Sequence, residues 1–230
     1  MDSEIMRKSH SITHVLYDMD GLLLDTEIFY TIVNKEIAQR YGKVFDWSIK
    51  SKTIGLKSQD SARVLIDELR LPLTVADYLE TRKGMLDALF PQAEPKAGAL
   101  RLTQHLHHHK IPQAVATSSN RHHFDLKTSR HKEWFRIFEY IVIGDDPEVK
   151  EGKPSPDIFL LAADKLGAQP RRCLVFEDAP SGVKAARAAG MHVVAVPDPN
   201  MADHPFPEAD EILASLEEFD PAKWGLPPFA

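Results

Sequence analysis

Residues 13–26 read Thr13-His-Val-Leu-Tyr-Asp-Met-Asp-Gly-Leu-Leu-Leu-Asp-Thr26. The apolar run before Asp18 predicts a buried strand, and parallel sheets build their binding sites at the carboxyl ends of such strands. Asp18 and Asp20 leave this strand together, next to a glycine that permits a sharp turn. Two unpaired carboxylates so close together repel each other, and a hard divalent cation such as Mg2+ would remove that repulsion. This segment therefore predicts a metal-assisted site at the edge of an α/β sheet.

Three further polar clusters lie near predicted core elements. The first is a run of small residues that ends in hydroxyl and amide side chains, which can hydrogen-bond an anion. The second places one lysine between a glycine and a proline, directly before a predicted helix. The third is an apolar strand that ends in two acids. In chain order these clusters are Thr117-Ser118-Ser119-Asn120, Gly152-Lys153-Pro154 and Glu177-Asp178.

In this order and spacing, the four clusters resemble the motifs of the haloacid dehalogenase superfamily of phosphatases. The resemblance covers nearly the whole chain, from Thr13 to the mid-190s for the motifs. The segments Phe124–His131 and Gly144–Val149 and the ending Trp224-Gly-Leu-Pro resemble the branch of pseudouridine-5'-phosphatases and glycerol-3-phosphatases. The resemblance implies that the strands bearing Asp18 and Asp178 are neighbours in the sheet. It does not choose between the two substrates of that branch.

The resemblance and the residue types together predict the catalytic roles. Asp18 is expected to attack phosphorus and form an aspartyl phosphate, with Asp20 acting first as acid and then as base. Lys153 supplies positive charge, and Mg2+ is held by Asp18, the Asp20 carbonyl and Asp178. Glu177 either ligates Mg2+, directly or through water, or only orients Lys153.

Substrate binding is predicted at two places. Thr117, Ser118, Ser119 and Asn120 are expected to hold the phosphoryl group and the neighbouring part of the substrate. Lys57 follows a glycine that interrupts a helical pattern and is a candidate substrate contact.

The sequence predicts a Rossmann-like core with a helical insert. Strands are expected at residues 13–18, 113–117, 140–143, 172–176 and 191–196, alternating with helices at 98–109, 159–166 and 181–189, which is typical of a parallel sheet covered on both faces. Residues 27–41, 58–69 and 74–89 have helical patterns and no strand between them. In the first of these helices, Phe29, Val33, Ile37 and Tyr41 form a stripe that should face other helices. We therefore predict a catalytic core of residues 1–25 and 95–230 and a helical cap domain of residues 26–94.

Composition agrees with a cytosolic enzyme but does not identify one. The formal charge of −6 disfavours nucleic acid and anionic membranes as the main partner, and a single cysteine excludes an internal disulfide. No apolar run approaches the length of a membrane span and the first ten residues lack a signal-peptide core, so a cytoplasmic protein is expected, either a monomer or a weak homo-oligomer. The expected partner is a small phosphorylated metabolite.

The leading hypothesis is a Mg2+-dependent phosphatase of a small sugar, nucleotide or polyol phosphate, with pseudouridine 5'-phosphate and glycerol 3-phosphate as first candidates. Two alternatives remain open from the sequence. A phosphosugar mutase similar to β-phosphoglucomutase would use the same aspartyl phosphate but release no net phosphate. A non-catalytic module would bind phosphosugars without turnover.

Overall fold

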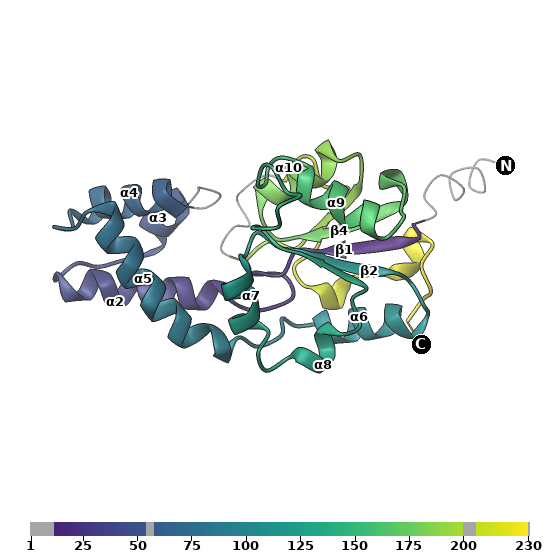
Figure 1. The fold of residues 1–230 in the computed structure, drawn as a ribbon, viewed down its shortest axis with the longest axis horizontal. Helices are drawn as coiled ribbons and strands as arrows, with labels where there is room; N and C mark the ends of the chain where they lie inside the picture. Colours follow the sequence, from purple (N-terminus) through teal and green to yellow (C-terminus); the bar gives the residue numbers. More distant parts are fainter. Residues whose placement is uncertain (1–11, 54–57, 200–205, 230) are drawn as a thin grey trace. The chain divides into compact units, whose positions relative to one another are not determined.

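The computed structural model describes residues 12–53, 58–199 and 206–229. The chain divides into two compact units, Met1–Asp25 with Glu94–Ala230, and Thr26–Ala93 (Figure 1). The first unit holds the sheet, and the second is helical.

The first unit is built on a parallel sheet. Its described residues form six strands in the order β3-β2-β1-β4-β5-β6, and every neighbouring pair is parallel. The strands are β1 (His14–Tyr17), β2 (Gln113–Ala116), β3 (Tyr140–Val142), β4 (Cys173–Glu177), β5 (His192–Ala195) and β6 (Glu211–Ile212). The predicted α/β fold class is confirmed, and so is the adjacency of β1 and β4 that the family resemblance implied. The chain runs from β1 to β2 on one side and reaches β4 on the other, which makes the carboxyl end of β1 a topological switch point.

Helices cover both faces of this sheet. Figure 1 shows α9 (Asp157–Lys165) and α10 (Pro180–Ala188) on one face, and α6 (Ala99–His108) and α8 (Lys132–Phe135) on the other. Leu16, Val115 and Val175, in the middle of three adjacent strands, are fully buried. Cover on both faces explains why these strands are apolar throughout instead of alternating with polar residues.

A tight turn follows β1. The backbone amides of Leu23 and Leu24 both donate to the Met19 carbonyl, and Gly21 adopts a φ of 79°, where a side chain would be strained. Beyond the turn, Asp25 N donates to Glu94 O at 2.8 Å and Lys96 N to Leu23 O at 2.9 Å. The segment that leaves the core and the segment that returns to it are therefore hydrogen-bonded side by side.

The second unit consists of helices. They are α2 (Glu27–Arg40), α3 (Trp47–Lys50), α4 (Ser58–Leu69) and α5 (Val75–Leu89), with short 3-10 turns η1 (Ser51–Thr53) and η2 (Phe90–Gln92). Within it, the Tyr78 hydroxyl donates to Asn34 Oδ1 at 2.8 Å and so joins α5 to α2. Phe29, Val33 and Ile37 are buried as predicted. Tyr41 is not: the helix ends at Arg40, and the next residue leaves helical geometry and is exposed.

The chain after β6 packs on the first unit. Short turns η5 (Leu216–Glu218) and η6 (Pro221–Trp224) place Phe219 edge-on against Phe176 of β4, with ring centroids 4.8 Å apart. The Trp224 indole donates to Glu211 Oε2 at 3.0 Å. Four short helices and strands have no counterpart in the sequence prediction: α3, α7 (Arg121–Lys127), α8 and β6. No helix in the described part of the chain is both long and apolar enough to cross a bilayer.

Candidate active site

The strand register brings the predicted motifs to one edge of the sheet. Tyr17 pairs with Phe176 across β1 and β4, and Asp18 N donates to Phe176 O at 3.0 Å. Asp18 therefore leaves β1 beside Glu177, the last residue of β4. On the other side, Tyr17 pairs with Val115, so β2 ends at the same level and delivers Thr117 to this edge.

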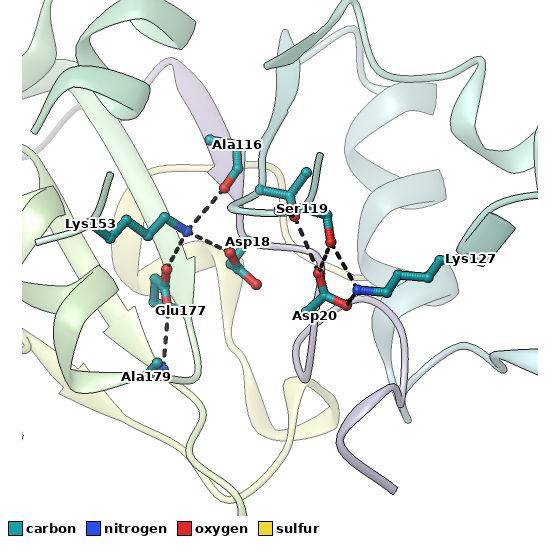
Figure 2. Close-up of polar contacts among 9 residues, drawn as sticks. Asp18, Asp20, Ala116, Ser119, Lys127, Lys153, Glu177 and Ala179 are labelled. Atoms are coloured by element: carbon teal, nitrogen blue, oxygen red, sulfur yellow. Dashed lines mark hydrogen bonds and ion pairs between the residues drawn. The ribbon is translucent and has the colours of Figure 1, made fainter. Parts of the chain in front are cut away.

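Lys153 joins the buried acids of β1 and β4. Its ammonium donates to Asp18 Oδ1 at 2.5 Å, to Glu177 Oε1 at 2.6 Å and to the Ala116 carbonyl at 3.0 Å (Figure 2). The lysine side chain is only 6% exposed. A buried ammonium with three oxygen acceptors is fully satisfied, so the lysine holds one fixed position between the two acids.

Both carboxylate oxygens of Glu177 accept hydrogen bonds. Its Oε1 accepts from Lys153, and its Oε2 accepts from the Ala179 amide at 3.0 Å. Gly182, in the first turn of α10, lies so close that a Cβ built there would overlap the Glu177 carboxyl group. The glutamate is packed into a slot that only glycine leaves open, and both of its oxygens are engaged.

The ionisation of this cluster is strongly perturbed. The pKa of Asp18 is raised to about 7, because burial and the Glu177 and Asp20 carboxyl groups raise it by more than the Lys153 ammonium lowers it. Burial acts to lower the pKa of Lys153, but the Asp18 and Glu177 carboxylates raise it above its usual value. The lysine is a permanent cation, but its attraction does not offset the burial and the neighbouring carboxyl groups that raise the pKa of Asp18.

Asp20 lies in a second polar cluster. Its Oδ1 accepts from the Lys127 ammonium at 2.5 Å, and its Oδ2 accepts from the Ser119 hydroxyl at 2.7 Å and the Thr117 hydroxyl at 3.3 Å. Lys127 also donates to Ser119 Oγ at 2.8 Å. Figure 2 shows the two clusters side by side, Asp18 with Lys153 and Asp20 with Lys127. Each aspartate of the pair thus has a lysine of its own.

The residues after β2 have different surroundings. Thr117 is buried, and its hydroxyl accepts from Ser119 N at 3.0 Å while donating to Asp20. Ser118 is exposed. Gly144 lies so close to the Ser118 backbone that a Cβ atom on residue 144 would overlap the Ser118 carbonyl group. The Asn120 side chain caps α7 by accepting from His123 N at 2.8 Å. Asn120 therefore has a local structural role, whatever else it contacts.

Two further residues were predicted for the site, Asp178 and Lys57. Asp178 follows the end of β4 and is half-buried, at the same edge of the sheet. Lys57 lies outside the residues that the structure describes.

Lys127 is a site residue that the sequence analysis missed. It is 1% exposed and ends α7, three positions after the buried Phe124. That spacing puts both side chains on one helix face. A lysine on the apolar face of a helix was the available signal, and α7 was too short to be recognised as a helix.

The comparisons with known proteins identify the family. Residues 12–190 match the haloacid dehalogenase-like hydrolases. The chain belongs to this family. An Arabidopsis thaliana relative named (DL)-glycerol-3-phosphatase 1, mitochondrial, is 51% identical over 95% of this chain and 75% of its own length. A Drosophila melanogaster relative named probable pseudouridine-5'-phosphatase is 43% identical over 100% of this chain and 99% of its own.

Solved structures agree. CbbY from Rhodobacter sphaeroides, crystallised with phosphate, aligns with a TM-score of 0.73 at 26% identity, over 90% of this chain and 96% of that one. The family match and the phosphatase relatives together make this chain an enzyme of the phosphatase type.

Proposed function

We propose that the chain is a Mg2+-dependent phosphomonoesterase that forms an aspartyl phosphate on Asp18. The observation that carries the proposal is the buried Asp18 carboxyl group. Lys153 holds its Oδ1, while its Oδ2 makes no hydrogen bond with the part of the chain that the structure describes (Figure 2). A fixed carboxylate with one oxygen available is what attack on phosphorus requires.

The donor chemistry of the site fits Mg2+. Asp18, Asp20 and Asp178 supply hard oxygen atoms at one sheet edge, and the pKa of Asp18 is raised by burial and by the neighbouring carboxyl groups despite the Lys153 ammonium. Asp18, the Asp20 carbonyl and Asp178 would hold the ion. Bound Mg2+ would supply positive charge to the phosphate and lower the barrier for an anionic nucleophile. Glu177 has both oxygens engaged, which supports a role in orienting Lys153 over one as a direct ligand.

In the first half of the proposed reaction, the phosphoryl group passes from the substrate to Asp18. Asp18 attacks phosphorus as the bond to the ester oxygen breaks, and Asp20 gives its proton to that leaving oxygen. Lys153 stabilises the charge on the phosphoryl oxygens, with the Thr117 hydroxyl and the following backbone amides as further donors.

The second half returns the enzyme to its starting state. Asp20, now a carboxylate, takes a proton from water, and the water oxygen attacks phosphorus. The bond between phosphorus and Asp18 breaks, phosphate leaves, and Asp20 is protonated again for the next substrate.

The substrate is proposed to be a small sugar, nucleotide or polyol phosphate. The 51% identity to a glycerol-3-phosphatase puts glycerol 3-phosphate first, and the 43% identity to a probable pseudouridine-5'-phosphatase puts pseudouridine 5'-phosphate second. The helical unit would act as the cap that covers the bound substrate.

Phosphate release across a panel of nucleotide, sugar and polyol phosphates tests the proposal. We expect selective release with Mg2+ from one of the two candidates, and none from Asp18→Asn, which keeps the shape of the residue but is a poor nucleophile. A hydroxylamine-labile phosphoenzyme should form in the parent protein and be absent from the variant. Full turnover in Asp18→Asn would exclude the proposed nucleophile.

Product analysis separates hydrolysis from the mutase alternative. A Thermotoga maritima structure titled putative beta-phosphoglucomutase aligns with a TM-score of 0.70 at 25% identity, so the same scaffold is found under that name. A phosphatase releases one phosphate for each substrate consumed. A mutase would convert one sugar phosphate to another with no net phosphate, and that result would favour the alternative.

A further inference from the structure

Lys127 is a buried cation with a defined set of partners. Its side chain is 1% exposed, and its ammonium donates to Asp20 Oδ1 at 2.5 Å and to Ser119 Oγ at 2.8 Å (Figure 2). Removing an ammonium group from water is costly unless charged and polar partners replace the water. Lys127 bears this cost beside Asp20, whose carboxyl group accepts from its ammonium.

The contacts form a closed triangle. Ser119 Oγ accepts from Lys127 and donates to Asp20 Oδ2 at 2.7 Å, so each of the three side chains touches the other two. The members come from different elements: Asp20 from the turn after β1, Ser119 from the loop after β2, and Lys127 from the end of α7. Because the two oxygens of Asp20 are held by different donors, rotation of its carboxylate breaks at least one bond.

A general structural role would not require this arrangement. α7 is already capped by Asn120 and anchored by the buried Phe124, and Lys153 already supplies a cation to Asp18. The distinguishing consequence of the Lys127 contact is the orientation of the Asp20 carboxylate.

We propose that Lys127 is a positioning residue for Asp20. Together with Ser119 it fixes the Asp20 carboxylate at the site edge, so that proton exchange with the leaving oxygen and with water occurs from one orientation. The inference rests on the proposed function, in which Asp20 is the acid and base. Proton transfer needs a donor and acceptor held within hydrogen-bond reach, so a carboxylate free to rotate spends less time in position.

Lys127→Met tests the proposal because methionine keeps the length and apolar stem but removes the charge and the donors. We expect kcat for the best substrate of the panel to fall by roughly tenfold to hundredfold with KM changed by less than about threefold. Release of the first equivalent of nitrophenolate from 4-nitrophenyl phosphate should change by less than about fivefold, because this leaving group needs no proton. An equal loss with both substrates would overturn the proposal and leave Lys127 with a structural role.

A double-mutant cycle with Asp20→Asn supplies the second test. If Lys127 acts through Asp20, adding Lys127→Met to Asp20→Asn should lower kcat by less than about threefold further, because the group being positioned is already gone. Losses that multiply would mean that the two residues act independently and would contradict the inference. Lys127→Gln, which retains a donor, takes the place of Lys127→Met if circular dichroism shows that the methionine variant is unfolded.

Controls keep this inference separate from the proposed function. Lys165, the last residue of α9, forms an exposed ion pair with Glu148, and Lys165→Met should leave kcat unchanged. An inactive parent protein would refute the proposed function itself. An active parent whose Lys127 variant keeps full kcat for alkyl and aryl phosphates alike would refute the positioning role alone.

Discussion

Replacing Gly182 with alanine should destabilise the protein although the change favours a helix. Gly182 lies in the first turn of α10, and in a helix alanine is more favourable than glycine by about 1 kcal/mol. Here, however, the added methyl group would overlap the Glu177 carboxyl group. The side chain must leave its slot, and Lys153 and the Ala179 amide then lose a buried acceptor.

The magnitude follows from the broken contacts. Removing one partner from a buried ion pair costs about 3–5 kcal/mol, because the remaining charge is left uncompensated. After the gain in helix propensity, a net loss of about 2 kcal/mol or more should remain. For a chain of this size that corresponds to a fall in Tm of at least about 4 °C. Activity should fall as well, since Lys153 would be free to leave its position beside Asp18.

Gly84→Ala is the matched control. Gly84 lies inside α5, is exposed, and a Cβ built there meets nothing within 4 Å. This substitution should raise stability by about 0.5–1 kcal/mol and leave activity unchanged. Thermal and urea unfolding of both variants, followed by circular dichroism, gives the comparison. If Gly182→Ala were as stable as Gly84→Ala and fully active, Glu177 could not be packed against α10 as described, and the account of Lys153 would be wrong.

Three further predictions concern charge and burial. Asp178→Asn should raise the Mg2+ concentration needed for half-maximal activity; an unchanged magnesium titration would remove Asp178 from the metal site. The pKa of Asp18 is raised by burial to about 7, so its contribution to stability is complete below the unfolded pKa near 4 and is lost as the pH rises through 7. In EDTA, urea midpoints from pH 5 to pH 8 should therefore fall less in Asp18→Asn than in the parent, and parallel profiles would contradict this. Burial raises the pKa of Cys173 to about 12, so the folded protein should resist thiol reagents at pH 8 and react only in denaturant, as colorimetric thiol titration would report.

The sequence predicted the sheet well because its signals are local. The apolar runs that became β1, β2 and β4 end in polar residues, and strand ends in a parallel sheet share one edge. The long helices of the second unit were also predictable from their apolar spacing, apart from Tyr41, where the last turn had already ended. α3, α7, α8 and β6 were missed because elements of two to seven residues leave too little periodicity to detect.

The contacts within the site were less predictable, because they depend on partners far apart in the chain. The role of Glu177 was left open between metal ligation and orientation of Lys153. The structure shows that Lys153 and the Ala179 amide engage its two oxygens and that its carboxyl group packs against Gly182. Lys127 is separated from Asp20 by 107 positions, and no local pattern connects them. A buried lysine paired with an acid becomes visible only when the two side chains are placed in space.

The two lysines show how the fold resolves a conflict between stability and chemistry. The register of β1 and β4 places Asp18 beside Glu177. The turn after β1 adds Asp20 two residues later. The register that the proposed reaction requires therefore concentrates negative charge. One cation offsets part of it at Asp18 and another at Asp20. The pKa of Asp18 nevertheless remains raised, chiefly because burial removes the water that would stabilise its carboxylate. A divalent cation would take the place of the missing water at this buried carboxylate, so in the proposed reaction the same burial that raises the pKa of Asp18 would favour Mg2+ binding there.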